Sequence, residues 1–375
     1  MSLKNIQISM PCLFGTEGIA ANEIKFKLGI TPTCENGRVS FCGELSDVVR
    51  ANILLSCVER VQILLGTFKA STFDELFCGV KALPLADFIP KDGAFPVKGW
   101  SLNSKLTSIP DCQSIVKKAA VECLKQRYQV AWFEETGASY QLMFSIMNDT
   151  ASIYLDTSGQ GLHKRGYRQE GGIAPIKETL AATIADCARV KFYHRVIDPC
   201  CGSGTLLIEA ARKALNIAPG LDRHFVCERW NLIPQRVFHE IRDKARSEIR
   251  QSDEFECFGY DIVPEAVELT LHNAEKAGVG KYVKVALRSI SAFKLPEDEK
   301  KTVVLANPPY GERLADIEEA KKIYHEMGER FVQRQGVGYY IISPEAEFER
   351  IFGRKAQKRR KLYNGMIKCD LYMYY

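Results

Sequence analysis

The pattern of apolar and polar positions divides the chain into two halves with different periodicities. In the first half, up to about Asp156, apolar residues recur at helical spacing in residues 22–28, 48–65 and 113–127. Residues 140–147 alternate instead, and a turn at residues 148–150 leads into a second alternating run at 152–155, which predicts a hairpin. Helices and strands mixed in this way predict an α+β unit.

From Ile173 onward, short apolar strands alternate with amphipathic helices. The predicted strands are residues 195–198, 256–260, 282–287, 302–306 and 338–343, and the predicted helices are 205–215, 264–277 and 320–335, with an inserted helical excursion at 218–254. This alternation predicts an α/β fold with a parallel, doubly wound sheet. Residues 362–374 read as a closing antiparallel hairpin with an Asn364-Gly365 turn, which is typical of one Rossmann-like subclass. A stretch rich in glycine and basic residues, 158–172, is the predicted domain linker.

Composition narrows the class of protein without naming a function. The net charge of +5 is small for 375 residues, so it permits nucleic-acid binding but does not demand it. No apolar run approaches ~18 residues, so no membrane span is expected, and residues 1–5 lack the apolar core of a signal peptide. The 13 cysteines include no Cys-x-x-Cys pair, which predicts reduced thiols in a cytoplasmic protein and no metal site.

The first chemical motif runs from Asp198 to Thr205, where a predicted strand passes into a helix. Ligands of doubly wound folds bind at this end of the sheet, and Gly202 and Gly204 would let a ligand lie against bare backbone. Leu207 stands where a dinucleotide fingerprint has its third glycine, so that class of site is disfavoured. The alternative interpretation is a tight strand–helix turn with no ligand.

Asp261 ends the second predicted strand of this half. A carboxylate there can accept hydrogen bonds from both hydroxyls of a ribose. The alternative is that Asp261 caps the helix that begins near Pro264.

The most specific motif is Asn307-Pro308-Pro309-Tyr310, at the end of the fourth predicted strand. The two prolines fix the backbone and remove two amide donors. The Asn307 amide oxygen and the Pro308 carbonyl could together accept the two hydrogens of a planar exocyclic amine, on which Tyr310 could stack. The alternative is a Pro-Pro turn.

Taken together, these motifs resemble those of class I methyltransferases that act on amino groups. Residues 163–168, 174–182, 198–210 and 307–314 are similar to the THUMP-containing RNA guanine-N2 methyltransferases of bacteria. Residues 14–17 with 23–29 resemble that family's ferredoxin-like start, and residues 152–168 resemble the end of a THUMP domain. The resemblance implies a ferredoxin-like region at 1–44, a THUMP RNA-binding domain at 45–157 and a Rossmann-like class I methyltransferase domain at 158–375.

The resemblance also implies a cofactor, S-adenosyl-L-methionine, and a substrate, the exocyclic N2 amine of a guanine in large-subunit ribosomal RNA. It places Ala174, Pro175, Asp198, Cys200, Gly202, Gly204, Asp261, Ile262, Ser289, Ile290 and Asn307 around the cofactor. It assigns catalysis to Asn307, Pro308, Pro309 and Tyr310. Ser289 departs from the family pattern, which has an acidic residue at this place.

Two other functions stay open on the sequence alone. The Asn307 motif does not distinguish guanine N2 from adenine N6 on RNA or DNA. A non-catalytic RNA-binding protein with the same fold is expected to have lost Asn307, Gly202 or Asp261, and all three are present. The basic run Arg354–Lys361 is either a phosphate-contacting patch or a solvated loop before the hairpin.

Overall fold

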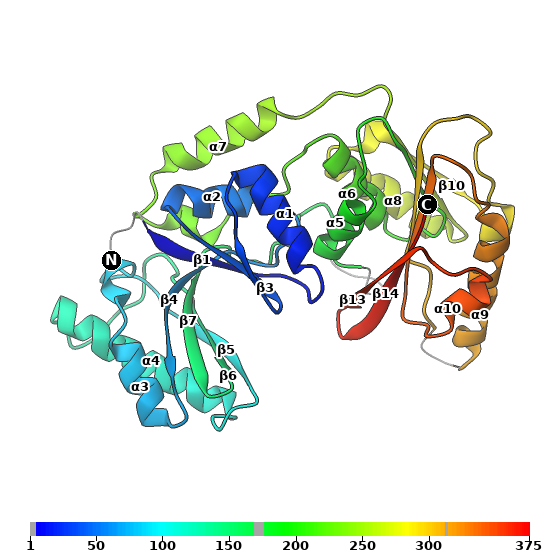
Figure 1. The fold of residues 1–375 in the computed structure, drawn as a ribbon. Helices are drawn as coiled ribbons and strands as arrows, with labels where there is room; N and C mark the ends of the chain where they lie inside the picture. Colours follow the sequence, from blue (N-terminus) through cyan, green and yellow to red (C-terminus); the bar gives the residue numbers. More distant parts are fainter. Residues whose placement is uncertain (1–4, 169–175, 312–313) are drawn as a thin grey trace.

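The computed structural model describes residues 5–168, 176–311 and 314–375, and the strands of these residues form two seven-stranded sheets (Figure 1). The first sheet has the order β2-β3-β1-β4-β7-β6-β5 and the second β10-β9-β8-β11-β12-β14-β13. The strands of the first sheet are β1 Ile6–Pro11, β2 Thr33–Glu35, β3 Arg38–Gly43, β4 Gln62–Lys69, β5 Val97–Leu102, β6 Leu142–Met147 and β7 Thr150–Asp156. Those of the second are β8 Arg195–Asp198, β9 Glu256–Asp261, β10 Val283–Leu287, β11 Thr302–Ala306, β12 Val337–Ser343, β13 Lys358–Asn364 and β14 Ile367–Tyr374.

Helices cover both sheets. They are α1 Glu17–Leu28, α2 Leu45–Leu54, α3 Phe73–Lys81, α4 Ile109–Tyr128, α5 Glu178–Cys187, α6 Thr205–Ala214, α7 Gln235–Ser247, α8 Pro264–Lys276, α9 Leu314–Arg330 and α10 Phe348–Phe352. None of the helices in the described ranges combines the length and the apolar character that a bilayer crossing requires.

The first sheet is antiparallel except for the pair β5–β6. The predicted hairpin is confirmed as β6–β7: Met147 pairs with Thr150, and Asn148 and Asp149 between them both have positive φ. Left-handed φ at both central residues matches the right-handed twist of the flanking strands.

The helix predicted for residues 48–65 was half wrong. Helix α2 ends at Leu54 and strand β4 begins at Gln62. The Glu23 carboxylate accepts the backbone N–H groups of Ser56 and Cys57, at 2.8 and 2.9 Å, and so fixes a turn between the two elements. This tertiary hydrogen bond cannot be read from apolar periodicity.

The second sheet confirms the predicted α/β fold class. Strands β10, β9, β8, β11 and β12 are parallel, and β14 and β13 close the sheet as an antiparallel hairpin. The predicted turn is displaced by one residue, because Asn364 pairs with Ile367 and the two loop residues are Gly365 and Met366. Gly365 takes φ 63°, and the Met366 side chain is left 97% exposed at the tip.

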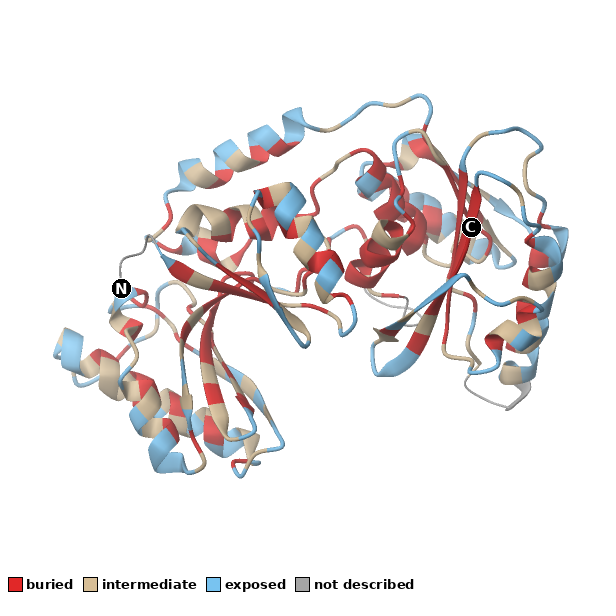
Figure 2. Cartoon of the chain, in the orientation of Figure 1, coloured by how far each residue is buried: buried red, intermediate tan, exposed pale blue. Residues whose placement is uncertain are grey.

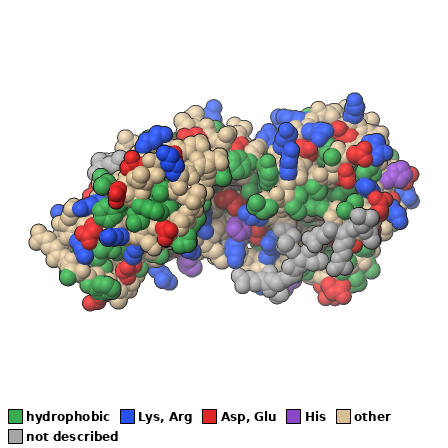
Figure 3. Space-filling view, turned by 90° about the horizontal axis from the view of Figure 1, so that it is seen from below, with side chains coloured by type: hydrophobic (Ala, Val, Ile, Leu, Met, Phe, Trp, Pro, Cys, Tyr) green, Lys and Arg blue, Asp and Glu red, His purple; other side chains and the backbone are tan. Residues whose placement is uncertain are grey.

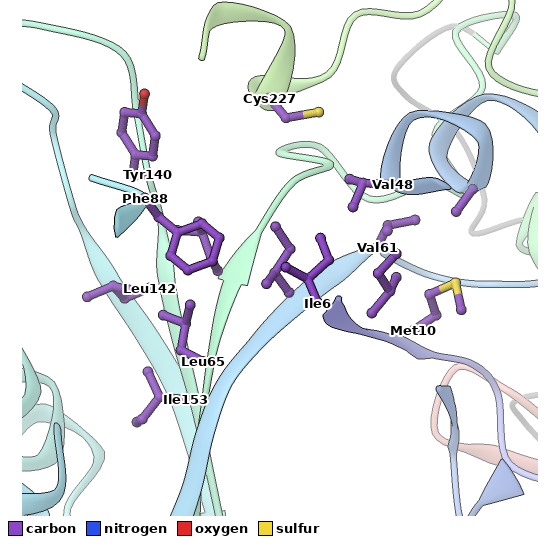
Figure 4. Packing of buried hydrophobic residues seen from close by; sticks show 14 of the residues in the cluster. Ile6, Met10, Val48, Val61, Leu65, Phe88, Tyr140, Leu142, Ile153 and Cys227 are labelled. Carbon is purple, nitrogen blue, oxygen red and sulfur yellow. The ribbon is translucent and has the colours of Figure 1, made fainter. Parts of the chain in front are cut away.

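The insertion between α6 and β9 packs on the first half of the chain. Helix α7 lies along α2 with its buried side toward it (Figure 2), and the short 3-10 helix η2, Val226–Arg229, places Cys227 over the same core as Ile6 and Val48 (Figure 4). The Trp230 ring stacks on Tyr140 at 4.8 Å between centroids, and its Nε1–H donates to the Ser139 carbonyl at 2.9 Å. Residues of the second half therefore complete the hydrophobic core of the first.

The predicted linker is not a free tether over its described part. Leu162, Arg165 and Tyr167 are buried, and the Arg223 guanidinium of the insertion donates to the Leu162 carbonyl at 2.8 Å. Burial of this stretch fixes the two halves relative to each other.

A single carboxylate joins the loop before β4 to the start of the second half. Glu59 pairs with Lys177 at 3.2 Å and with His163 at 3.5 Å, and it accepts the hydroxyl of Thr179. Burial alone would raise the pKa of Glu59, but these partners more than offset it and hold the pKa at about 2. Glu59 therefore contributes stability above its unfolded pKa near 4.5, and this contribution is lost as the pH falls through about 2.

We predict that Glu59→Gln lowers the free energy of unfolding at pH 7 by about 1–3 kcal/mol, the usual size of a lost charge-assisted hydrogen bond. Urea denaturation measures the change. Glu318→Gln is the matched control, because Glu318 is exposed and its ion pair among the described side chains is with its helical neighbour Lys321; its change should stay within about 0.5 kcal/mol. Equal stabilities of the Glu59→Gln protein and the wild type would show that this contact does not hold the halves together.

Candidate active site

Three predicted site residues meet at the carboxyl edge of the second sheet. Asp198 ends β8, Asp261 ends β9 and Asn307 follows the last residue of β11. Strand β8 pairs with β9 on one side and with β11 on the other, so neighbouring residues at this edge are roughly 5 Å apart in the hydrogen-bonding direction. The parallel topology thus brings together side chains that are far apart in the sequence.

The glycine loop is tied to the neighbouring strand. Gly202 N–H donates to the Asp261 carboxylate at 2.8 Å, and Cys201 N–H donates to the Tyr260 carbonyl at 2.9 Å. Gly202 and Gly204 have φ of 53° and 78°, values that glycine adopts without strain. A Cβ on Gly202 would meet no atom within 4 Å, so the loop presents bare backbone to open space.

Asp198 lies in the middle of this edge and is almost completely buried. Its carboxylate accepts the Cys200 N–H at 3.0 Å. Burial, together with the charge of nearby Asp261, outweighs this hydrogen bond and raises the pKa of Asp198 to about 8. A cation placed beside this carboxyl group would lower its pKa and favour its ionised form.

On the outer side, Asp261 has apolar neighbours. Ile262 is 65% exposed, and Leu287, which is level with Asp261 on β10, is 60% exposed. A carboxylate flanked by exposed aliphatic side chains and a bare glycine backbone fits a nucleoside, with the hydroxyls on the acid and the base against the apolar groups.

Ser289 and Ile290 have defined contacts within the protein, and their cofactor role stays a prediction. The Ser289 hydroxyl lies 2.8 Å from the Ser291 hydroxyl and accepts the Ser291 N–H, so it caps a short 3-10 helix. The Ile290 side chain is buried in the core beneath α9. Ala174 and Pro175 lie outside the described residues.

Two tyrosine hydroxyl groups form hydrogen bonds with the Asn307 motif. Tyr324, from α9, donates to the Pro309 carbonyl at 3.1 Å. The Tyr310 hydroxyl donates to the Asn307 amide oxygen and lies 3.4 Å from the Asn364 amide nitrogen of the terminal hairpin. Burial raises the pKa of Tyr310, which keeps its hydroxyl protonated as a donor.

The Tyr310 ring is half-buried and packs against the core of the second half. Stacking of this ring on a base stays a prediction. The Tyr310 hydroxyl occupies one lone pair of the Asn307 oxygen, and the other stays available.

The sequence did not single out Leu287, Tyr324 or Asn364. Leu287 could have been found as an apolar residue at a strand end level with Asp261. Asn364 is 54 residues from Tyr310 and was interpreted only as part of a turn, so no local signal linked the two.

Family comparisons agree with this geometry. Residues 165–373 match the family model described as RMKL-like, methyltransferase domain. Residues 7–62 match the RlmL ferredoxin-like domain and residues 70–156 match the THUMP domain, so the resemblance found in the sequence is confirmed. The domain boundaries set from the sequence stay predictions.

Individual relatives extend the likeness to nearly the whole chain. YpsC of Bacillus subtilis (strain 168), which carries the name of an RNA methyltransferase, is 42% identical over 96% of this chain and 94% of its own length. The ribosomal RNA large subunit methyltransferase K/L of Psychromonas ingrahamii is 31% identical over 97% of this chain, which spans about half of that protein (49%). The crystal structure of SMU.472, a methyltransferase in complex with SAH, superposes with a TM-score of 0.93 at 37% identity and covers 99% of this chain and 98% of its own.

Two glycine variants should separate ligand contact from folding. Gly202→Ala should fold with a modest loss of stability, about 1–2 kcal/mol for an alanine in the left-handed region. It should bind S-adenosylmethionine poorly, because the methyl group of the alanine enters the open space beside the loop. Gly204→Ala is the matched comparison: its Cβ would lie 2.6 Å from the Thr270 side chain, so it should lose more stability. Calorimetry measures the affinity and thermal melts the stability of both variants. Unchanged affinity of Gly202→Ala would show that the glycine loop does not contact the cofactor.

The buried carboxyl group predicts a specific dependence on pH. A folded pKa of about 8 for Asp198 means that its contribution to stability is full below the unfolded value of 3.8 and is lost as the pH rises through 8. Asp198→Asn should therefore gain stability relative to the wild type between pH 5 and pH 8, by at least about 1 kcal/mol.

Urea denaturation of the cofactor-free proteins at both pH values tests this relative gain. Asp253→Asn, at a fully exposed acid, is the control and should keep a constant difference from the wild type. A constant difference for Asp198→Asn as well would contradict a raised pKa at this site.

Proposed function

Because this chain belongs to the RMKL-like methyltransferase family, we propose that it methylates the exocyclic N2 amine of a guanine in large-subunit ribosomal RNA. The family uses S-adenosylmethionine, so the cofactor expected from the sequence is confirmed. The observation that carries the proposal is the position of Asn307 beside Asp198 and Asp261 at one sheet edge.

The residues of the cofactor side have complementary proposed roles. Asp261 would accept hydrogen bonds from the ribose hydroxyls, the Gly202 backbone would lie against the cofactor, and Ile262 with Leu287 would flank the adenine. The positive charge of the cofactor, if bound beside the buried Asp198 carboxyl group, would favour the ionised form of that group. When bound, S-adenosylmethionine supplies an electrophilic methyl group on a sulfonium.

On the substrate side, orientation of the amine is the main task. The Asn307 amide oxygen and the Pro308 carbonyl accept the two amine hydrogens, which aims the nitrogen lone pair at the methyl group. The electrophile is already charged, so alignment supplies most of the rate enhancement. In this proposal the Tyr310 hydroxyl leaves the Asn307 oxygen when the base enters, and its ring then stacks on the base.

The first half has the proposed role of docking the RNA. It contains the ferredoxin-like and THUMP matches, and all of its described strands belong to the first sheet, whereas Asn307 lies at the edge of the second. Phosphate and shape contacts would position the RNA while the Asn307 pocket reads the base. A ribosomal RNA substrate places the proposed activity in the cytoplasm.

An adenine N6 amine is the alternative substrate, because two acceptors would orient either amine equally well. Incubation of the protein with labelled S-adenosylmethionine and protein-free ribosomal RNA or genomic DNA, followed by mass analysis of the nucleosides, separates the possibilities. N2-methylguanosine from RNA supports the proposal. N6-methyladenine would replace this proposal with the adenine alternative. The absence of a methylated product from both nucleic acids would indicate a non-catalytic RNA-binding protein.

The role of Asn307 predicts a selective loss of rate. Asn307→Ala should lower the single-turnover rate of methyl transfer on the order of 10²-fold, because one preorganised hydrogen-bond partner of the reacting group is removed. Its affinity for S-adenosylmethionine should stay within about three-fold of the wild type. Asn364→Ala removes the neighbouring amide that faces Tyr310 and is expected to lose far less activity. Equal rates for Asn307→Ala and the wild type would refute the assignment.

A further inference from the structure

The terminal hairpin extends past the sheet edge at which Asn307 lies. Ser343 ends β12 and is level with Asp370, whereas β14 begins three residues earlier, at Ile367. At about 3.4 Å per residue, the tip projects roughly 10 Å beyond the edge. In Figure 1 the β13–β14 hairpin points from the second sheet toward the first half of the chain.

The tip lies beside the substrate side of the site. Asn364, the last residue of β13, lies 3.4 Å from the Tyr310 hydroxyl through its amide nitrogen. Met366 is two residues further along the chain, at most about 7 Å away along the backbone. An exposed apolar side chain therefore lies two residues along the chain from the asparagine that faces Tyr310.

Strand β13 of the hairpin is supported by the first half. Gly15 approaches β13 so closely that a Cβ there would lie 2.4 Å from the Lys361 carbonyl, and the Arg360 guanidinium donates to the Gly15 carbonyl at 2.8 Å. Phe14 is 58% exposed, and its ring meets the Tyr363 ring edge to face at 6.2 Å. The tip is thus a braced projection rather than a free loop.

The hairpin surface is basic around this apolar tip. Lys368 lies opposite Tyr363 on the paired strand, and Lys361 shares the same face; both are exposed and form no ion pair among the side chains that the structure describes. The neighbouring acid Asp370 forms an ion pair with Arg359 at 2.7 Å. Seen from below, Figure 3 shows Lys and Arg side chains next to hydrophobic ones on this half of the molecule.

An apolar tip with lysines behind it fits nucleic acid better than a protein partner. The lysines suit phosphates, and a side chain such as methionine can insert between stacked bases. An amine in structured RNA reaches a pocket only when its base leaves the stack, which leaves a gap behind.

We propose that Met366 is a wedge that enters the RNA stack as the target base leaves it, with Lys361 and Lys368 contacting the flanking phosphates. This inference rests on the proposed function and adds a residue that acts on base extrusion rather than on methyl transfer. Met366 is 97% exposed and has no proposed role at Asn307 or at the cofactor, so its effect should depend on whether the target base is stacked.

The test compares two states of one RNA. Large-subunit ribosomal RNA transcribed in vitro is used either folded in Mg²⁺ or cut into short fragments and heat-denatured, and single-turnover transfer of tritiated methyl groups is measured. Met366→Ala should lower the rate about ten-fold or more on folded RNA and less than two-fold on the denatured fragments. Met366→Leu, which keeps a large apolar tip, should stay within two-fold of the wild type on both.

The control is Val332→Ala, at a 55% exposed valine between α9 and β12 of the second half, which should match the wild type on both RNAs. If Met366→Ala equals the wild type on folded RNA, the tip contacts another class of partner and the wedge is overturned. Equal losses on both RNAs would also overturn it, since a wedge acts only on stacked bases. A wild-type protein that methylates neither RNA would instead contradict the proposed function itself.

Discussion

The hydrogen bond from Gly202 N–H to the Asp261 carboxylate is the constraint on which the site geometry depends. It joins the loop after β8 to the end of β9 and holds the loop backbone at the edge of the sheet. It also keeps Asp261 near the buried Asp198, where the negative charge adds to the effect of burial on the Asp198 pKa. One contact thus sets both the shape of the glycine loop and the electrostatics beside it.

The glycine motif could be predicted from the sequence, but the hydrogen bonds that fix the site could not. The strand–loop–helix pattern around Gly202 and the strand end at Asp261 are local features, and parallel topology alone brings them together. The orientation of Tyr310 depends on Asn364, which belongs to a hairpin at the other end of the second half. Apolar periodicity has no access to such a contact, and it also missed the turn that Glu23 fixes before β4.

The two halves of the chain are fixed relative to each other by direct contacts. Glu59 binds the start of the second half, Trp230 packs on Tyr140, and Arg360 reaches the Gly15 carbonyl. These contacts fix the distance between the THUMP match and the Asn307 edge. A fixed separation would let the protein measure a distance along a structured RNA.

The insertion that carries Trp230 also has a consequence for synthesis of the chain. The strands of the first sheet are complete at Asp156, but part of their hydrophobic core, up to Ala245, is encoded much later. At about 5–20 residues per second, a ribosome needs several further seconds to supply the missing side chains. During that interval the nascent first half would expose an apolar surface around Tyr140, which makes it a natural client for chaperones that meet polypeptides at the exit tunnel.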